Sequence, residues 1–539
     1  MTLTRRTFLH HLGGGTVALG VGACGPLSGL ARAATRSGAL PRSTPEAQGV
    51  EAAGLVAFLD AFAHSRHELH SFMLVRHGAV VAEGWGVPYG PHYNHWLYSL
   101  SKSFTSTAVG FAVAEGRLTV EDRVVTFFPH DLPAQVSDHL AALQVKHLLT
   151  MSVGHATEPV REIVREEDWV RAFLAWPIPH PPGSAFLYNS AGTYMLSALV
   201  QKLTGQRVLD YLTPRLFEPL GIEGAAWETC PRGINTGGWG LSVPTEALAK
   251  FGQLYLRQGT WKGRALLTPA WVAEATTRHI QQPVPATPNR PNAENDWVQG
   301  YGYQFWRCTH AAFRGDGAFG QYAIVLPDHD AVIAMTGESP NMQGELDLVW
   351  KHLLPALHDG PLPADRASQR RLRQQWRAWK LAWPGQGAAA LPAEATAAGR
   401  VSGKTFQLER NALGLDTVSF GFNPSTCQVT FRTTANGYPI ACGLRQWQRG
   451  ETALPGTPPR LVSGGAPKPG TPAKLAAAGA WTDANTFEML WRYYESPHHD
   501  TVTCRFADQT VQVRFLNSLA QMGPNPQDAR PVLVGRLVG

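Results

Sequence analysis

Apolar residues are arranged differently in the two parts of the chain, and each arrangement predicts its own architecture. Two pairs of apolar runs, 72–76 with 79–83 and 323–326 with 331–335, are separated by short polar turns, which is typical of β-hairpins. The roughly 240 residues between these pairs are dominated by helical spacing. We therefore expect an α/β fold of the α+β type, with an antiparallel sheet assembled from both ends of one domain and flanked by helices.

The pattern changes after residue 363. Apolar residues in 366–383 fall at helical spacing with basic residues on the other faces, which predicts a connector helix packed on the first domain; a basic helix facing a membrane is the alternative. An Ala-rich linker follows, and the Pro- and Gly-rich stretch 454–472 predicts a mobile loop. Apolar and polar residues then alternate in four segments, which predicts a smaller β-rich domain without a catalytic constellation: 404–408, 428–432, 501–506 and 511–515.

The N-terminus resembles an export signal. Thr4-Arg5-Arg6-Thr7-Phe8-Leu9 is similar to a twin-arginine motif, and the apolar stretch after it is too short for a membrane span. Cleavage after Ala31-Arg32-Ala33 would leave a periplasmic or secreted protein. Alternatively, Val21-Gly22-Ala23-Cys24 resembles a lipobox, and lipidation of Cys24 would tether the protein to a membrane. The predicted organisation is a signal peptide 1–33, a first domain 34–363, a connector and linker 364–398, and a β-rich domain 399–539.

Composition narrows the classes of protein. The 539 residues are 44% hydrophobic and 16% charged, which is typical of a globular protein with a large core. Basic residues exceed acidic ones by six and are scattered, except between Arg366 and Lys380, so nucleic acid is not an expected partner. The six cysteines include no Cys-x-x-Cys and no zinc-ligand spacing, and one disulfide in the C-terminal part stays open. We expect neither a metal nor an organic cofactor.

One short motif carries candidate chemistry. Ser99-Leu100-Ser101-Lys102 is the one Ser-x-x-Lys of the chain, and it stands at the start of an apolar helical stripe. Residues three apart lie on one helix face, so the amine of Lys102 can reach the hydroxyl of Ser99. A lysine that loses its solvent shifts toward its neutral form and becomes a base for a serine nucleophile. The competing interpretation is a solvated serine beside a surface lysine on an ordinary helix.

The surroundings of this motif resemble a known family. Segment 98–110, Glu115-Gly116-Arg117-Leu118, Val145-Lys146-His147-Leu148-Leu149-Thr150-Met151 and Trp261-Lys262-Gly263-Arg264 are similar to serine hydrolases of the class C β-lactamase and penicillin-binding-protein fold. That group includes the family VIII carboxylesterases and the 6-aminohexanoate-dimer hydrolases. The resemblance covers residues from about Glu46 to about Leu357.

The resemblance implies roles for further residues. Tyr188, in Tyr188-Asn189-Ser190, matches the family's tyrosine, which shares the nucleophile's proton with the lysine. Ser190 stands where the family often has an asparagine that contacts substrate. The N–H groups of Ser99 and Gly315 would hold the oxyanion.

The chain departs from the family's penicillin-recognising members at their Lys-Thr-Gly motif. Segment 317–322 resembles the glycine-rich turn that follows this motif, but the residues counted back from it are Ala312-Phe313-Arg314. Polar groups of the substrate would instead meet Arg314, Asp316 and Gln321. Losing a charge-assisted contact to a carboxylate removes ~1.5–3 kcal/mol, so neutral esters or amides are favoured over β-lactams.

Together these residues predict a serine hydrolase that cleaves a small ester or amide through an acyl-enzyme. Ser99 is the expected nucleophile, with Lys102 and Tyr188 moving its proton. A D-Ala-D-Ala peptidase or weak β-lactamase would use the same residues. In a different class, the chain could be a catalytically silent protein that binds a ligand or peptidoglycan.

Overall fold

A six-stranded antiparallel sheet forms the centre of the first part of the chain, in a computed structural model that describes residues 38–283, 290–387, 389, 396–462 and 472–538. The predicted signal peptide and Cys24 lie outside the described residues. The described residues from Leu40 onward belong to one compact unit, so the predicted boundaries at 363 and 399 stay predictions.

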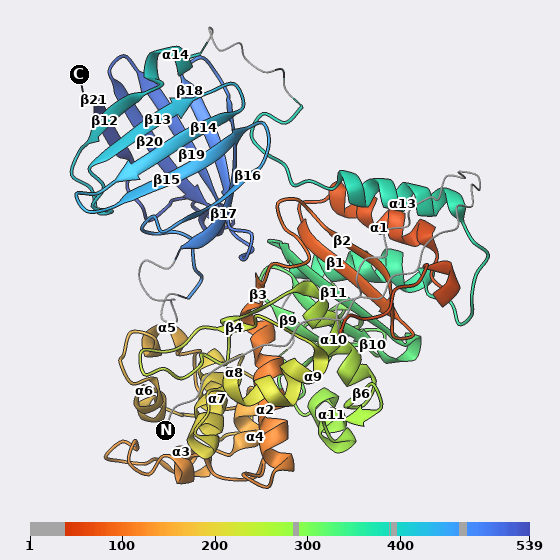
Figure 1. Cartoon of the computed structure of the whole chain (residues 1–539). Helices are drawn as coiled ribbons and strands as arrows, with labels where there is room; N and C mark the ends of the chain where they lie inside the picture. The colour runs from red at the N-terminus through yellow and green to blue at the C-terminus, as the bar shows by residue number, and fades with distance from the viewer. Residues whose placement is uncertain (1–37, 284–289, 388, 390–395, 463–471, 539) are drawn as a thin grey trace, which may run out of the picture. The chain divides into compact units, whose positions relative to one another are not determined.

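The sheet confirms the predicted assembly from two distant parts of the sequence. Its strand order is β2-β1-β11-β10-β9-β8, and red and green strands lie side by side in Figure 1. The bounds are β1 Glu68–Arg76, β2 Ala79–Trp85, β8 Trp306–Arg307, β9 Phe313–Gly317, β10 Gln321–Leu326 and β11 Ala331–Glu338. His77 and Gly78 both adopt positive φ, which closes the predicted two-residue hairpin between β1 and β2.

Helices cover both faces of this sheet. One face packs against α1 (Ala52–Ala63), α12 (Met342–Leu348) and α13 (Arg366–Ala378). The other packs against α10 (Thr245–Leu256) and the large helical core around α2 (Ser101–Ala114). Because both faces are covered, β10 and β11 are buried along their whole length.

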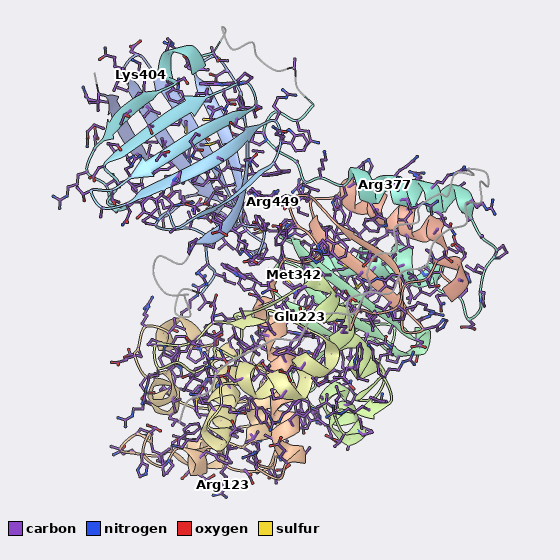
Figure 2. The ribbon with its side chains drawn as sticks, in the orientation of Figure 1. Arg123, Glu223, Met342, Arg377, Lys404 and Arg449 are labelled. Carbon is purple, nitrogen blue, oxygen red and sulfur yellow. The ribbon has the colours of Figure 1, made fainter. Side chains whose placement is uncertain are left out.

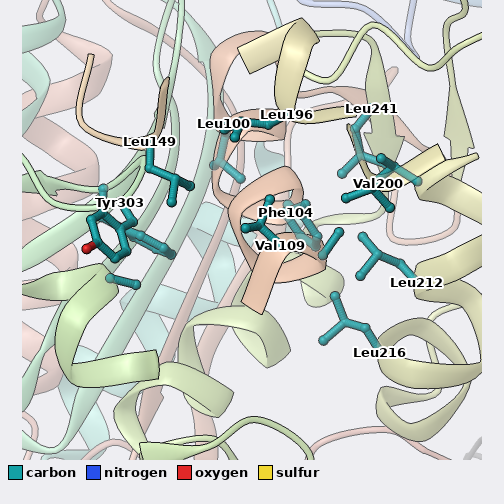
Figure 3. Close-up of a cluster of buried hydrophobic side chains, with 14 of the residues drawn as sticks. Leu100, Phe104, Val109, Leu149, Leu196, Val200, Leu212, Leu216, Leu241 and Tyr303 are labelled. Carbon is teal, nitrogen blue, oxygen red and sulfur yellow. The ribbon is translucent and has the colours of Figure 1, made fainter. Parts of the chain in front are cut away.

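Helix α2 lies at the centre of the helical core. It packs against α7 (Ser190–Thr204) and α8 (Val208–Leu212), and α4 (Val145–Leu149) packs in turn against α7. Figure 3 shows side chains of these helices around Phe104 and Val109 of α2. All residues of α2 from its first through Ala112 are buried, polar ones included. The polar start of α2 is therefore held out of water by apolar neighbours, which matters for the chemistry of Lys102.

The remaining elements are short. The helices are α3 Asp138–Ala142, α5 Val160–Ile163, α6 Trp169–Ala175, α9 Glu218–Leu220, α11 Pro269–Thr276, α14 Ala398–Val401 and α15 Ser518–Gln521. The strands are β3 His95–Trp96, β4 Ala226–Trp227, β5 Leu241–Val243, β6 Thr260–Trp261 and β7 Arg264–Ala265.

The C-terminal part is a β-barrel, which confirms the predicted β-rich region. Its ten strands follow the order β15-β14-β13-β12-β21-β20-β19-β18-β17-β16, and a further β15–β17 pairing closes the sheet. Inward residues such as Phe431 and Trp491 fill the interior. The bounds are β12 Lys404–Leu408, β13 Thr417–Phe422, β14 Thr426–Arg432, β15 Gly437–Leu444, β16 Gln448–Thr452, β17 Ala473–Trp481, β18 Thr486–Arg492, β19 His499–Ala507, β20 Thr510–Asn517 and β21 Leu533–Leu537.

The basic helix α13 packs on the protein, as the sequence favoured. Its Leu372 is buried, and the ring of Trp376 stacks on Phe72 of the sheet at 6.0 Å. Basic residues such as Arg377, labelled in Figure 2, lie on its exposed side. The helix ends at Ala378, so Trp379 and Trp383 lie outside it, in contrast to the predicted end. Among the described residues, no helix combines the length and apolar character needed to cross a bilayer.

The cysteines described by the structure, Cys230, Cys308, Cys427, Cys442 and Cys504, are all buried and free. Cys427 and Cys442 are register partners on β14 and β15. The disulfide that the sequence left open is thus not formed among these residues.

Packing of α13 on the sheet depends on a strand glycine. A Cβ atom at Gly84 would lie 2.1 Å from Cε3 of Trp376. We expect G84A to lower the free energy of unfolding by about 1–3 kcal/mol, measured by urea titration, because the ring must move. Gly450 of β16 is the control, since a Cβ there would meet no atom within 4 Å. An equal loss of stability in G450A would contradict this explanation.

Candidate active site

The Ser99 and Lys102 side chains meet at the start of α2. Residues Tyr98–Leu100 form a 3₁₀ turn that continues directly into α2 at Ser101. This continuous turn places Lys102 one helical turn beyond Ser99. Lys102 Nζ lies 3.0 Å from Ser99 Oγ, within hydrogen-bond distance.

Two further contacts hold the Lys102 amine. Nζ donates to the carbonyl of Gly238 at 2.7 Å and contacts Ser190 Oγ at 3.1 Å. A neutral amine has two N–H donors and one lone pair. It can therefore donate to Gly238 and Ser190 and still accept a proton from the hydroxyl of Ser99.

Burial adjusts the basicity of this amine. Lys102 is only 1% exposed, and loss of solvent lowers its pKa from the ordinary value of 10.5 to about 7. Glu158 and Asp316 act against this shift, because their negative charges favour the ammonium form. The balance leaves a large neutral fraction near pH 7, as a general base requires.

Tyr188 is the third group at this site. Lys102 Nζ lies 4.8 Å from the centre of its ring, and the Ser99 hydroxyl is a hydrogen-bond partner of its phenol. Burial raises the pKa of Tyr188 above its ordinary value, although the Ser99 contact acts in the opposite direction. The phenol therefore stays protonated when Lys102 is neutral, which suits it to donate a proton to a leaving group.

Ser190 and Glu158 support the lysine. The sequence predicted Ser190 as a substrate contact, whereas in the structure its hydroxyl contacts Lys102. Glu158 was not found from the sequence, because no motif or spacing connects it to Ser99. Its Oε1 accepts from the backbone N–H of Ser190 at 2.9 Å and of Ala191 at 3.3 Å. It thus fixes the first turn of α7 and adds a negative charge near Lys102.

Two predicted substrate contacts are buried side chains that already have partners within the protein. Arg314 is 0% exposed, donates to Asp316 at 2.7 Å and lies 4.6 Å from the ring centre of Trp297. Gln321 is equally buried, and its amide bonds the backbone carbonyls of Ala318 and Gly337. Both side chains hold the fold together, since a buried polar group must find partners within the protein. Asp316, 7% exposed, is the counter-ion of Arg314.

The strand pairing also argues against Gly315 as the oxyanion donor. The carbonyl of Ala312 accepts from the N–H of Cys308, on the side of β9 that faces β8. The carbonyl of Gly317 accepts from the N–H of Gly320, on the side that faces β10. Backbone groups alternate sides along an antiparallel strand, so the N–H of Gly315 points to its partner Ala323 on β10. The N–H of Asp316 points to the opposite edge, beyond the two residues of β9 that pair with β8. The pairing of β9 therefore leaves the N–H of Asp316, and not that of Gly315, outside the ladder of the sheet.

An aromatic groove adjoins Tyr188. It has a volume of about 260 Å³ and is lined by Phe186, Leu187, Tyr188, Gln282, Pro283, Trp297, Val298 and Trp306. Trp306 stacks on Tyr188 with 5.6 Å between ring centres, and Trp297 meets Trp306 edge-on at 4.9 Å. The groove is therefore suited to an apolar or planar group.

One cluster outside this site has the residue types of a metal centre. Among the described residues, Glu68, Glu338 and His499 bring ligand atoms within 4.8 Å of one another. The guanidinium of Arg492 bonds both oxygens of Glu68, one of them at 2.5 Å. A positive charge is thus already present where a cation would bind.

Comparison with known proteins assigns the family. The sequence model described as Beta-lactamase matches residues 63–354, more than half of the 539 residues. The chain belongs to the beta-lactamase family. This membership agrees with the mixed sheet-and-helix architecture of the first part and with a hydrolase.

Individual relatives are distant. The chain is 25% identical to a 6-aminohexanoate-dimer hydrolase of Paenarthrobacter ureafaciens over 50% of this chain and 73% of that protein. It is 24% identical to a beta-lactamase of Escherichia coli K12 over 39% of this chain and 56% of that protein. Among solved structures, a penicillin-binding protein homologue from Caulobacter crescentus is 20% identical, covers 58% of this chain and 99% of its own, and has a TM-score of 0.47.

The titration of Lys102 tests the site without any assay of activity. In protein labelled with ¹³C at lysine Cε, we expect one resonance to titrate with a midpoint near pH 7 and to disappear in K102M. In E158Q the midpoint should fall, because a charge that favours the ammonium form is removed. A midpoint above 9 in the wild type would contradict the desolvated site.

Proposed function

We propose that the protein is a serine hydrolase that cleaves a small ester or amide through an acyl-enzyme. The observation that carries this proposal is the 3.0 Å contact between the Ser99 hydroxyl and a buried lysine whose pKa is about 7. Such a pair supplies both the nucleophile and the base that activates it. Membership of the beta-lactamase family supports the same reaction class.

The reaction follows from the protonation states of the three groups. Ser99 Oγ attacks the substrate carbonyl while its proton passes to the neutral Lys102 amine. The tetrahedral oxyanion is held by the N–H of Ser99 and an N–H on the free edge of β9. Its collapse breaks the bond to the leaving group, which takes a proton from Tyr188, and Lys102 returns a proton to the phenol. Water then attacks the acyl-enzyme with the same groups in reversed roles and releases the acid.

The substrate should be uncharged near the reacting carbonyl. Arg314, which packs on the groove residues Trp297 and Trp306, is buried and neutralised by Asp316, so it cannot attract a substrate carboxylate. Trp297, Trp306 and Tyr188 offer apolar ring surface instead. These features favour an ester or amide with an apolar or aromatic group over a D-Ala-D-Ala peptide or a β-lactam, both of which carry a carboxylate.

An amide is the second candidate substrate. One relative carries the name 6-aminohexanoate-dimer hydrolase and aligns over half of this chain. Lys102 and Tyr188 can protonate an amine leaving group as well as an alcohol.

For the cellular location, we retain the proposal of a periplasmic or secreted enzyme, with a membrane tether through Cys24 as the alternative.

Replacing the nucleophile tests the proposal. S99A should abolish labelling by a fluorophosphonate probe and lower kcat/KM for p-nitrophenyl acetate by about 10³-fold or more, because the bond-forming atom is removed. S106A is the matched control on the same helix, since its buried hydroxyl has no hydrogen-bond partner among the described residues. Labelling absent from the wild type would favour the catalytically silent binding protein.

The aromatic groove yields a separate test. The enzyme should hydrolyse p-nitrophenyl phenylacetate with a kcat/KM about tenfold or more above that for the mono-p-nitrophenyl ester of succinic acid. W297A should reduce this preference, because one wall of the groove is removed, while hydrolysis of p-nitrophenyl acetate stays near the wild-type rate. Equal losses for the phenylacetyl and acetyl esters would exclude the groove as the acyl site.

A further inference from the structure

A loop of the C-terminal barrel contacts the segment that leads to Ser99. This loop, residues 493–498, joins β18 to β19. The carbonyl of Glu495 accepts from the N–H of Trp96 at 3.0 Å, and that of Ser496 accepts from the hydroxyl of Tyr89 at 2.9 Å. His498 Nε2 lies 2.5 Å from the hydroxyl of Tyr98. Three contacts from one loop therefore fall on residues shortly before the nucleophile.

Tyr98 has an unusual conformation for its position. It directly precedes Ser99, and its φ is +46°, in the left-handed region that bulky residues rarely occupy. Such a conformation persists only when the surroundings enforce it, and it is found disproportionately at functional sites. The backbone direction at Tyr98 sets where the Ser99 side chain begins.

The partner of Tyr98 is itself firmly held. His498 is 0% exposed, and its Nδ1 lies 2.6 Å from Glu338 Oε1, at the end of β11. Because a carboxylate only accepts, Nδ1 carries the proton in this contact, and the tautomer with this single ring proton lets Nε2 accept from the hydroxyl of Tyr98. The hydroxyl of Ser518 adds a contact to the same ring at 3.3 Å. The chain Glu338-His498-Tyr98 thus connects the central sheet, the barrel and the nucleophile's neighbour.

Phe319 completes the cluster. Its ring packs edge-on against Tyr98 at 5.5 Å and against His498 at 5.0 Å. Phe319 lies in the β9–β10 turn, directly after the strand whose free edge faces the reacting carbonyl in the proposed mechanism. One cluster therefore touches both the segment that carries Ser99 and the turn beside the oxyanion donors.

We propose that His498 of the barrel is a positioning residue, which holds Tyr98 in its left-handed conformation and thereby orients Ser99 toward Lys102. The barrel then acts as a part of the catalytic structure, although it contributes no group to the reaction. This inference rests on the proposed serine-hydrolase function for its kinetic consequences, but its geometric content is independent of that function.

Variants of the full-length protein separate positioning from general packing. Y98F removes a single oxygen atom, and H498A removes the acceptor. Both should slow labelling of Ser99 by the fluorophosphonate probe and lower kcat for p-nitrophenyl acetate by about 10–100-fold, with KM nearly unchanged. H498Q should recover much of the rate, since its carboxamide oxygen can accept from Tyr98. The double variant Y98F/H498A should be no slower than the slower single variant, because one interaction is lost in each.

His499 provides the matched control. Its Nδ1 bonds the other oxygen of Glu338 at 2.9 Å, and no contact joins it to Tyr98 among the described residues. H499Q should therefore label at a rate close to that of the wild type. Wild-type rates in Y98F and H498A, or an equal loss in H499Q, would overturn the assignment of His498.

Crystal structures of the wild type, H498A and H499Q make the test independent of activity. We expect the distance from Ser99 Oγ to Lys102 Nζ to exceed 3.0 Å in H498A and to stay unchanged in H499Q. An unchanged Tyr98 backbone and an unchanged distance in H498A would overturn the inference. If the wild type is not labelled, the hydrolase proposal fails, and these structures still decide whether His498 positions Ser99.

Discussion

The desolvation of one amine is the constraint on which the rest of this site depends. Lys102 could serve Ser99 as a base only if its ammonium form were disfavoured near neutral pH, and burial inside the helical core does this. Burying a lysine costs stability, because the unfolded chain keeps its proton at pH values where the folded chain releases it. That penalty applies fully below pH 7 and declines as the pH rises from about 7 toward 10.5.

The surrounding architecture can be understood as support for this buried amine. Apolar side chains of α4, α7 and α8 exclude water from α2, while Gly238 and Ser190 satisfy the N–H groups of the amine. Glu158 and Asp316 keep the pKa of Lys102 from falling further. The site thus balances desolvation against two nearby carboxylates, and neither influence alone would leave the amine half-protonated at neutral pH.

Elsewhere in the protein, arginine side chains are neutralised by carboxylates of the same chain. Arg314 and Asp316 form a buried pair, and the buried Arg492 is paired with the partly buried Glu68, so that little free charge is left for a ligand. In the first pair the guanidinium is held by Asp316 inside the protein. The pair of Arg492 and Glu68 lies in the contact region between the barrel and the central sheet, where Glu338 also contacts His498 and His499.

Local patterns in the sequence predicted a large share of this structure. The hairpins of the central sheet, the helix after Ser99 and the strands of the barrel follow from apolar periodicity, because period two and period 3.6 are imposed by the backbone itself. The spacing of Ser99 and Lys102 is local in the same sense, and the family resemblance added Tyr188. Each of these depends on residues that are close together in the chain or on a motif that can be read directly.

Only the tertiary structure decided which distant residues share the site. Glu158 and Gly238 reach Lys102 through chain segments with no recognisable motif, and His498 lies 400 residues from the tyrosine that it contacts. The burial and pairing of Arg314, Gln321 and Gly315 were likewise not visible in the sequence, because whether a side chain or an N–H is free for a ligand depends on partners supplied by neighbouring strands. Sequence by itself determined the elements and the reactive pair, whereas burial, strand register and long-range contacts decided their electrostatics, since those quantities exist only once the chain is folded.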